Sequence, residues 1–134
     1  MKGTKLILAG GVFNGLMVIF HIFFWKLFDW PQGLVSLSLD NRGIIQTLNL
    51  HLILVFILFS LVSLFKAKEL LTTTLGRMMA ATIGLFYLLR VVNEFIFWSM
   101  SDLVSQLVVV VCLGVGLAYL VPLLRNRSDR PALT

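Results

Sequence analysis

Four long apolar segments separated by short polar connections dominate the chain. They occupy residues 6–28, 44–65, 78–98 and 103–124, so each is 21 to 23 residues long. At ~1.5 Å of rise per residue, a helix of this length spans about 30 Å or slightly more, which matches the hydrocarbon core of a bilayer. The pattern therefore predicts an all-α, polytopic membrane protein with four transmembrane helices.

The composition supports the same class and limits what else the chain can contain. Hydrophobic residues make up 59% of the 134 residues and charged residues 13%, and the mean hydropathy is +0.99. Four crossings leave only short connections and a tail at 125–134, with no room for a separate soluble domain. We therefore predict one domain over 1–134, an antiparallel four-helix bundle. Its single Cys112 is expected to be a small buried hydrophobe.

The basic residues indicate how the bundle is oriented in the membrane. One side carries Lys2, Lys5, Lys66, Lys68, Arg77, Arg125, Arg127 and Arg130, and the other carries Lys26 and Arg42. Because cytoplasmic segments carry an excess of Lys and Arg, this asymmetry places both termini in the cytoplasm. Topology explains the net charge of +5, and no nucleic-acid partner is expected. The predicted location is a cytoplasmic membrane of bacterial type, with the lipid bilayer as the surrounding partner.

Five polar residues inside the apolar segments are the strongest functional signal. His21 and His51 each lie seven residues from the outer end of their segments, and Arg90, Asn93 and Glu94 occupy the outer half of the third. Helix rise places all five about 6–12 Å below the outer boundary. An ionisable side chain at mid-membrane costs about 2.5–3.5 kcal/mol on insertion scales, so such residues usually serve a partner, a ligand or a transport path. We predict that they line a pocket that opens outward.

Helical spacing adds two further residues to this predicted pocket. Arg90 and Glu94 are four positions apart, so they can form an ion pair on a face that also carries Tyr87. Asn14 shares a face of the first segment with His21. The predicted ligand-binding residues are His21, His51, Arg90, Asn93, Glu94, Tyr87 and Asn14.

The two histidines also suggest a metal or a cofactor. At matched depth on different helices they could ligate a haem axially, or join Glu94 as a two-histidine, one-carboxylate set for a divalent metal. The candidate metal ligands are therefore His21, His51 and Glu94. No spacing motif for haem or metal accompanies them, and the alternative is that each histidine bonds Asn93, Tyr87 or a backbone carbonyl. No nucleophile–base arrangement is visible, so catalytic residues and an enzymatic activity stay open.

Small residues four positions apart mark three helix faces suited to close packing. The pairs are Gly11 and Gly15, Ala80 and Gly84, and Gly114 and Ala118. Such faces allow membrane helices to approach closely, within one chain or between subunits. They lie toward the cytoplasmic half, so we expect a bundle that is narrow there and wider, with a polar lining, toward the exterior.

The connection at 29–43 alternates apolar and polar residues in its middle. This alternation predicts a short strand-like or interfacial segment. We expect the connection to rest on lipid head groups rather than to act as a lid over the pocket.

These features favour an integral membrane protein that binds a small ligand or cofactor in an outward-facing polar pocket within the bundle. One alternative is a small transporter or channel that acts as a homo-oligomer. The inner half offers few polar residues for such a path, which weakens that alternative. Another is an accessory subunit that packs against a larger membrane complex through its glycine faces, with a purely structural polar cluster.

Overall fold

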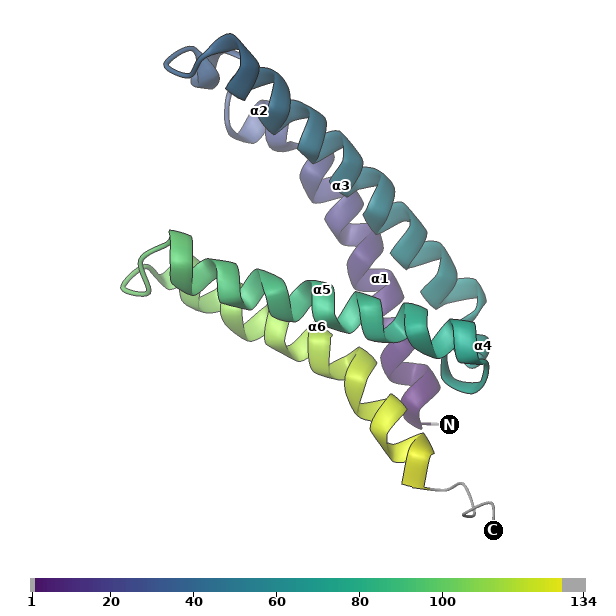
Figure 1. The fold of residues 1–134 in the computed structure, drawn as a ribbon. Coiled ribbons are helices and arrows are strands. Elements are labelled where there is room, and N and C mark those ends of the chain that lie inside the picture. The colour runs from purple at the N-terminus through teal and green to yellow at the C-terminus, as the bar shows by residue number, and fades with distance from the viewer. Residues whose placement is uncertain (1, 129–134) are drawn as a thin grey trace.

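The computed structural model describes residues 2–128, which form a succession of helices (Figure 1). The elements are α1 (Lys2–Ile22), α2 (Phe24–Leu27), the 3₁₀ helix η1 (Gln32–Leu34), α3 (Leu39–Phe65), α4 (Ala67–Thr72), α5 (Thr74–Phe97) and α6 (Leu103–Ser128). Helices α1, α3, α5 and α6 are each long and apolar enough to cross a membrane. The predicted all-helical class and the four helices of spanning length are thereby confirmed.

Three of the long helices, α1, α3 and α5, begin earlier than the apolar segments, and in α3 and α5 a capping side chain sets the first residue. The Ser38 hydroxyl accepts a hydrogen bond from the Asn41 amide at 3.3 Å, and α3 begins five residues before the predicted position 44. The Thr73 hydroxyl accepts from the Gly76 amide at 3.0 Å at the start of α5. Such caps satisfy N–H groups that the first turn of a helix leaves unpaired. Hydropathy therefore underestimates the length of both helices.

The first apolar segment and the connection after it differ from the prediction. Residues expected to form one helix over 6–28 form α1 and α2, with a break at Phe23. The indole of Trp25 donates to Oε1 of Gln46 at 3.2 Å, which ties α2 to α3. The expected strand-like stretch within 29–43 is wrong, since η1 and the first turn of α3 occupy this connection. A lone strand would leave backbone N–H groups unpaired there, whereas helical turns pair them.

The long helices form two pairs that meet at one end and diverge at the other (Figure 1). Helix α1 packs along α3, and α5 packs along α6. The pairs touch through α1 with α6 and through the short α4, which contacts all four long helices. At this closed end the first turn of α1 meets the end of α6, since a Cβ on Gly3 would lie 3.1 Å from Cβ of Pro122. The opposite end, where the pairs separate, is termed the open end.

A buried polar network joins all four long helices. The Asn14 amide on α1 donates to the Tyr119 hydroxyl on α6 at 3.1 Å and to the Gly10 carbonyl at 2.7 Å. Its oxygen accepts from the Tyr87 hydroxyl on α5 at 2.8 Å, and the Ser63 hydroxyl on α3 lies 2.6 Å from that of Tyr119. These four side-chain groups belong to residues that are at most 3% exposed. We term Asn14, Ser63, Tyr87 and Tyr119 the central polar network.

Small residues bring α1 close to α3 near this network. Gly11 and Gly15 face Ser63 and Ser60, so that added Cβ atoms would lie 2.9 and 3.3 Å from those side chains. The Ser60 hydroxyl donates to the Gly11 carbonyl at 2.9 Å. Ala80 on α5 is fully buried. These positions are in helix contacts, where packing residues were expected.

The packing face of α6 is displaced by two residues from the predicted one. Gly114 has no atom within 4 Å of where a Cβ would lie, and Ala118 is only half-buried. Gly116 packs instead, because a Cβ at either Gly84 or Gly116 would lie 3.2 Å from the carbonyl oxygen of the other. Small residues occupy positions 114, 116 and 118, so spacing alone does not decide which face of the helix is buried.

Gly84→Leu is expected to force α5 and α6 apart. Its Cβ alone would lie 2.6 Å from Cγ of Leu120, and overpacking of a filled contact costs about 1–3 kcal/mol. A lower midpoint of thermal unfolding in detergent solution is the expected result. Gly114→Leu is the matched control, since it adds the same side chain to a position with no neighbouring atom within 4 Å. Equal midpoints for the two variants would contradict the assigned contact.

Candidate ligand-binding site

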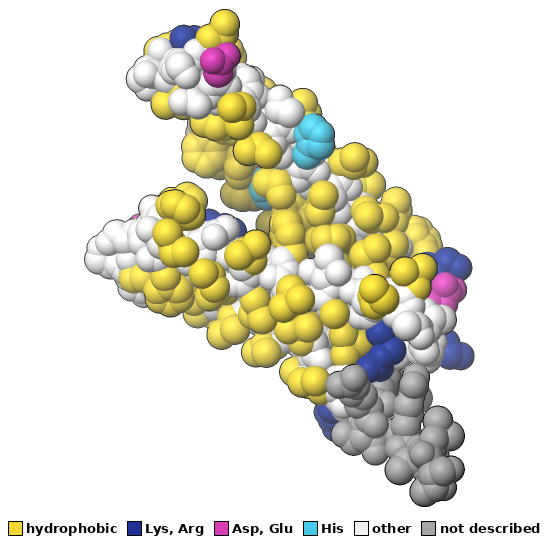
Figure 2. Space-filling model, viewed as in Figure 1, with side chains coloured by type: hydrophobic (Ala, Val, Ile, Leu, Met, Phe, Trp, Pro, Cys, Tyr) yellow, Lys and Arg dark blue, Asp and Glu magenta, His cyan; other side chains and the backbone are white. Residues whose placement is uncertain are grey.

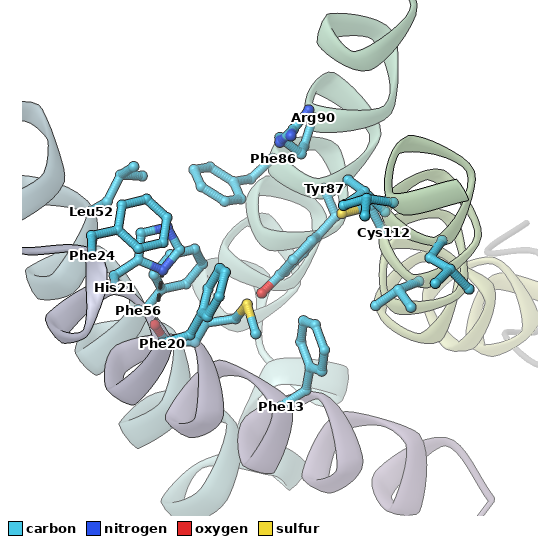
Figure 3. Close-up of a pocket in the computed structure, with 15 residues that line it drawn as sticks. Phe13, Phe20, His21, Phe24, Leu52, Phe56, Phe86, Tyr87, Arg90 and Cys112 are labelled. Atoms are coloured by element: carbon cyan, nitrogen blue, oxygen red, sulfur yellow. Dashed lines mark hydrogen bonds between the residues drawn. The ribbon is translucent and has the colours of Figure 1, made fainter. Parts of the chain in front are cut away.

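A pocket of about 390 Å³ lies between the two helix pairs, and all four long helices contribute to its wall (Figure 3). Ligand pockets in proteins usually measure about 300–1,000 Å³, so this one has the size to take a small molecule. Its aromatic lining residues are Phe13, Phe20, Phe24, Phe56, Phe86 and Tyr87. Aliphatic residues and Cys112 from α6 complete the wall opposite α1. The pocket is therefore mainly apolar, rather than polar-lined as expected.

The phenylalanines hold one another in place through ring contacts. Phe20 and Phe24 meet edge to face, with centroids 5.0 Å apart and planes at 88°. Phe56 on α3 meets Phe86 on α5 in the same manner at 5.7 Å and 90°, so this contact bridges the two helix pairs. Edge-to-face pairs stabilise by about 0.5–1.5 kcal/mol beyond their buried area. The pocket wall is thus built from mutually packed rings.

His21 brings a hydrogen-bond acceptor into this aromatic wall. Its Nδ1 lies 2.9 Å from the Met17 carbonyl, as the dashed line in Figure 3 marks. A carbonyl oxygen only accepts, so this bond assigns the ring proton to Nδ1 and leaves Nε2 as an acceptor. The ring stacks on Phe24 at 4.5 Å between centroids and lies 4.8 Å from Phe56. The sequence analysis predicted that His21 lines a pocket, and His21 belongs to the lining of this one.

Arg90 lies on the opposite wall and is paired with Glu94 on the same helix. Their side chains form the ion pair that their spacing predicts, with the Glu94 side chain 3% exposed and that of Arg90 35% exposed. The Arg90 guanidinium also lies over the Trp98 ring, 4.8 Å from its centroid. A guanidinium carries five N–H donors, so the contact with Glu94 leaves others for a ligand. The pair brings donors to the pocket without net charge.

The structure does not assemble the predicted metal set of His21, His51 and Glu94. His51 is exposed on α3, where its Nδ1 lies 2.8 Å from the Thr47 carbonyl, and it is not part of the pocket wall. Glu94 is engaged by Arg90. Among residues 2–128, no group of three or more His, Cys, Asp or Glu side chains could hold a metal ion. The two histidines were predicted to lie at the same depth, but depth does not decide the direction in which each side chain points around its helix.

The remaining predicted residues divide between the pocket and its surroundings. Tyr87 lines the pocket and also donates to Asn14, so the central polar network lies against the pocket wall. Asn14 itself is fully buried in that network. Asn93 is half-buried and does not belong to the lining. Of the seven predicted residues, the lining therefore contains His21, Tyr87 and Arg90.

Sequence reasoning missed the aromatic wall and Tyr119. Phe13, Met17, Phe20 and Phe24 follow the i, i+4, i+7, i+11 spacing of one helix face, which is a usable signal. Their neighbours on α1 are apolar as well, so the spacing did not stand out. Comparison of the chain with known protein families, curated proteins and solved structures finds no match. The geometry of the pocket is therefore the basis for a function.

Proposed function

We propose that this protein binds a small, largely apolar molecule in the pocket between its helix pairs. The supporting observation is the pocket itself, which combines packed aromatic rings with an acceptor on His21 and donors on Arg90. A concave, mostly apolar cavity with a few convergent polar groups is the usual form of a small-molecule site. A purely structural apolar interface would need neither the imidazole of His21 nor the guanidinium of Arg90.

The proposed orientation is an antiparallel bundle with the open end toward the exterior and both termini in the cytoplasm. Figure 2 supports it, because Lys and Arg side chains gather around the closed end. Lys66, Lys68 and Arg77 lie in or beside α4 and at the start of α5, and Arg125 lies near the end of α6. An excess of basic residues marks the cytoplasmic side of membrane proteins. The pocket would then lie in the outer half of the bilayer.

Transport has less support than binding. A transport path would have to pass the central polar network and the glycine contacts, which hold the helices together between the pocket and the closed end. The accessory-subunit alternative predicts that changes to His21 alter only stability or assembly. Ligand binding predicts that they alter occupancy of the pocket.

Cys112 gives a direct test of occupancy, because it is the only cysteine of the chain and lines the pocket. In lipid nanodiscs, we expect saturating 4-octylphenol or octylbenzene to slow its reaction with N-phenylmaleimide by about tenfold, as high occupancy requires. The control is Cys112→Ala combined with Leu113→Cys, which moves the thiol to a neighbouring position that is 41% exposed. Equal slowing at both positions would mean that the compounds act through the bilayer and would overturn the proposal.

A further inference from the structure

The pocket favours an uncharged head group. Arg90 is the charged residue of its wall, and Glu94 already offsets that charge. His21 donates to the Met17 carbonyl among phenylalanine rings, where an imidazolium would be desolvated without a counter-ion. An anionic ligand would have to compete with Glu94 for Arg90, and a cationic ligand would find that carboxylate taken. Burial of an unpaired charge is strongly unfavourable, so neutral molecules fit best.

The acceptor on His21 requires a donor from the ligand. Once Nδ1 is bonded to Met17, Nε2 has a lone pair and no proton. His21 is half-buried in the apolar pocket wall, so a ligand that covers this nitrogen and supplies an O–H gains over one that covers it without a donor. The surrounding rings of Phe20, Phe24 and Phe56 favour a planar aromatic group next to that O–H.

We infer that the pocket binds a lipophilic phenol. The ring packs among the phenylalanines, the hydroxyl donates to Nε2 of His21, and the hydroxyl oxygen is available to the donors on the Arg90 wall. An apolar tail continues along the aliphatic side chains of α6, which form the wall opposite α1. This inference rests on the proposed function, because it names the ligand class of the same pocket.

A matched pair of compounds isolates the hydroxyl. 4-Octylphenol and 4-octylanisole share ring and tail, but the ether has no O–H to donate. Protection of Cys112 is measured in nanodiscs for each compound, with concentrations expressed as the mole fraction in the bilayer. The phenol is expected to reach half-protection at a mole fraction about tenfold lower than the ether, the effect of one buried hydrogen bond.

Two histidine variants attribute that preference to the pocket. His21→Phe is expected to abolish the difference between phenol and ether while the ether still protects Cys112. His51→Phe is the matched control, because His51 makes the same bond to the carbonyl four residues earlier, at 2.8 Å, but is exposed outside the pocket. This control is expected to keep the full preference for the phenol.

The outcomes separate this inference from the proposed function. Equal protection by phenol and ether in the unchanged protein, or a preference that survives in His21→Phe, overturns the phenol assignment and leaves ligand binding intact. Failure of octylbenzene, phenol and ether alike to protect Cys112 overturns both. The comparison of the two compounds needs no variant, so a His21→Phe protein that fails to fold does not prevent the test.

Discussion

Replacing Arg90 with leucine is expected to lower the free energy of unfolding by about 3 kcal/mol, because it leaves the buried Glu94 carboxylate without its partner. The Glu94 side chain is 3% exposed, and Arg90 is its partner. Without Arg90, the carboxylate must either stay unpaired in apolar surroundings or take up a proton. The midpoint of chemical unfolding, followed by circular dichroism in detergent micelles, measures the loss.

The double variant Arg90→Leu, Glu94→Leu separates lost charge from lost packing. Replacement of both partners by apolar residues removes the unpaired carboxylate and is often close to neutral, so most of the lost stability should return. If the double variant is as unstable as Arg90→Leu alone, the packing of the guanidinium on Trp98, 4.8 Å away, matters more than the charge of Glu94. That result would contradict the prediction.

Asn14→Leu is expected to cost about 2–3 kcal/mol, because it removes the centre of the central polar network. Asn14 is fully buried and bonds the hydroxyls of Tyr87 and Tyr119 as well as the Gly10 carbonyl. Leucine has a similar size, so the loss should reflect hydrogen bonds rather than volume. Three of the long helices lose a contact at once, and the same unfolding measurement should show a lower midpoint.

Asn93→Leu provides the comparison for this prediction. Asn93 is a half-buried asparagine near the end of α5 and takes no part in the central polar network. A change away from buried networks usually alters stability by about 0.5 kcal/mol or less. Equal losses for Asn14→Leu and Asn93→Leu would show that the network does not hold the helix pairs together.

Length and hydropathy were sufficient to predict four long helices, because a bilayer demands a minimum apolar length, but they did not predict the break at Phe23 or the short helices α2, η1 and α4. The pairing of Arg90 with Glu94 was also predictable, since residues four apart on a helix are neighbours regardless of tertiary structure. Both inferences depend on distance along the chain alone. Neither inference depends on which face of a helix packs against another helix.

The direction in which each helix faces was not predictable. In a soluble helix, polar residues mark the solvent side, but in a membrane the lipid-facing and protein-facing sides are both apolar. His51 therefore shared the predicted depth of His21 and yet is exposed, while Gly116 packs in place of Gly114. The aromatic wall was hidden for the same reason, because Phe20 and Phe24 stand among other apolar residues on α1 and α2.

Because the helix pairs are joined at one end only, a small rotation at that end produces a larger displacement at the other end. Helix α3 runs from Leu39 to Phe65, and its Ser63 belongs to the central polar network near the closed end. By helix rise, about 36 Å of α3 extend from that point toward the open end. A rotation of about 5° at the network would displace the far end by about 3 Å, twice the rise of one residue. A small rotation at the central polar network would therefore change the separation of the two helix pairs at the open end.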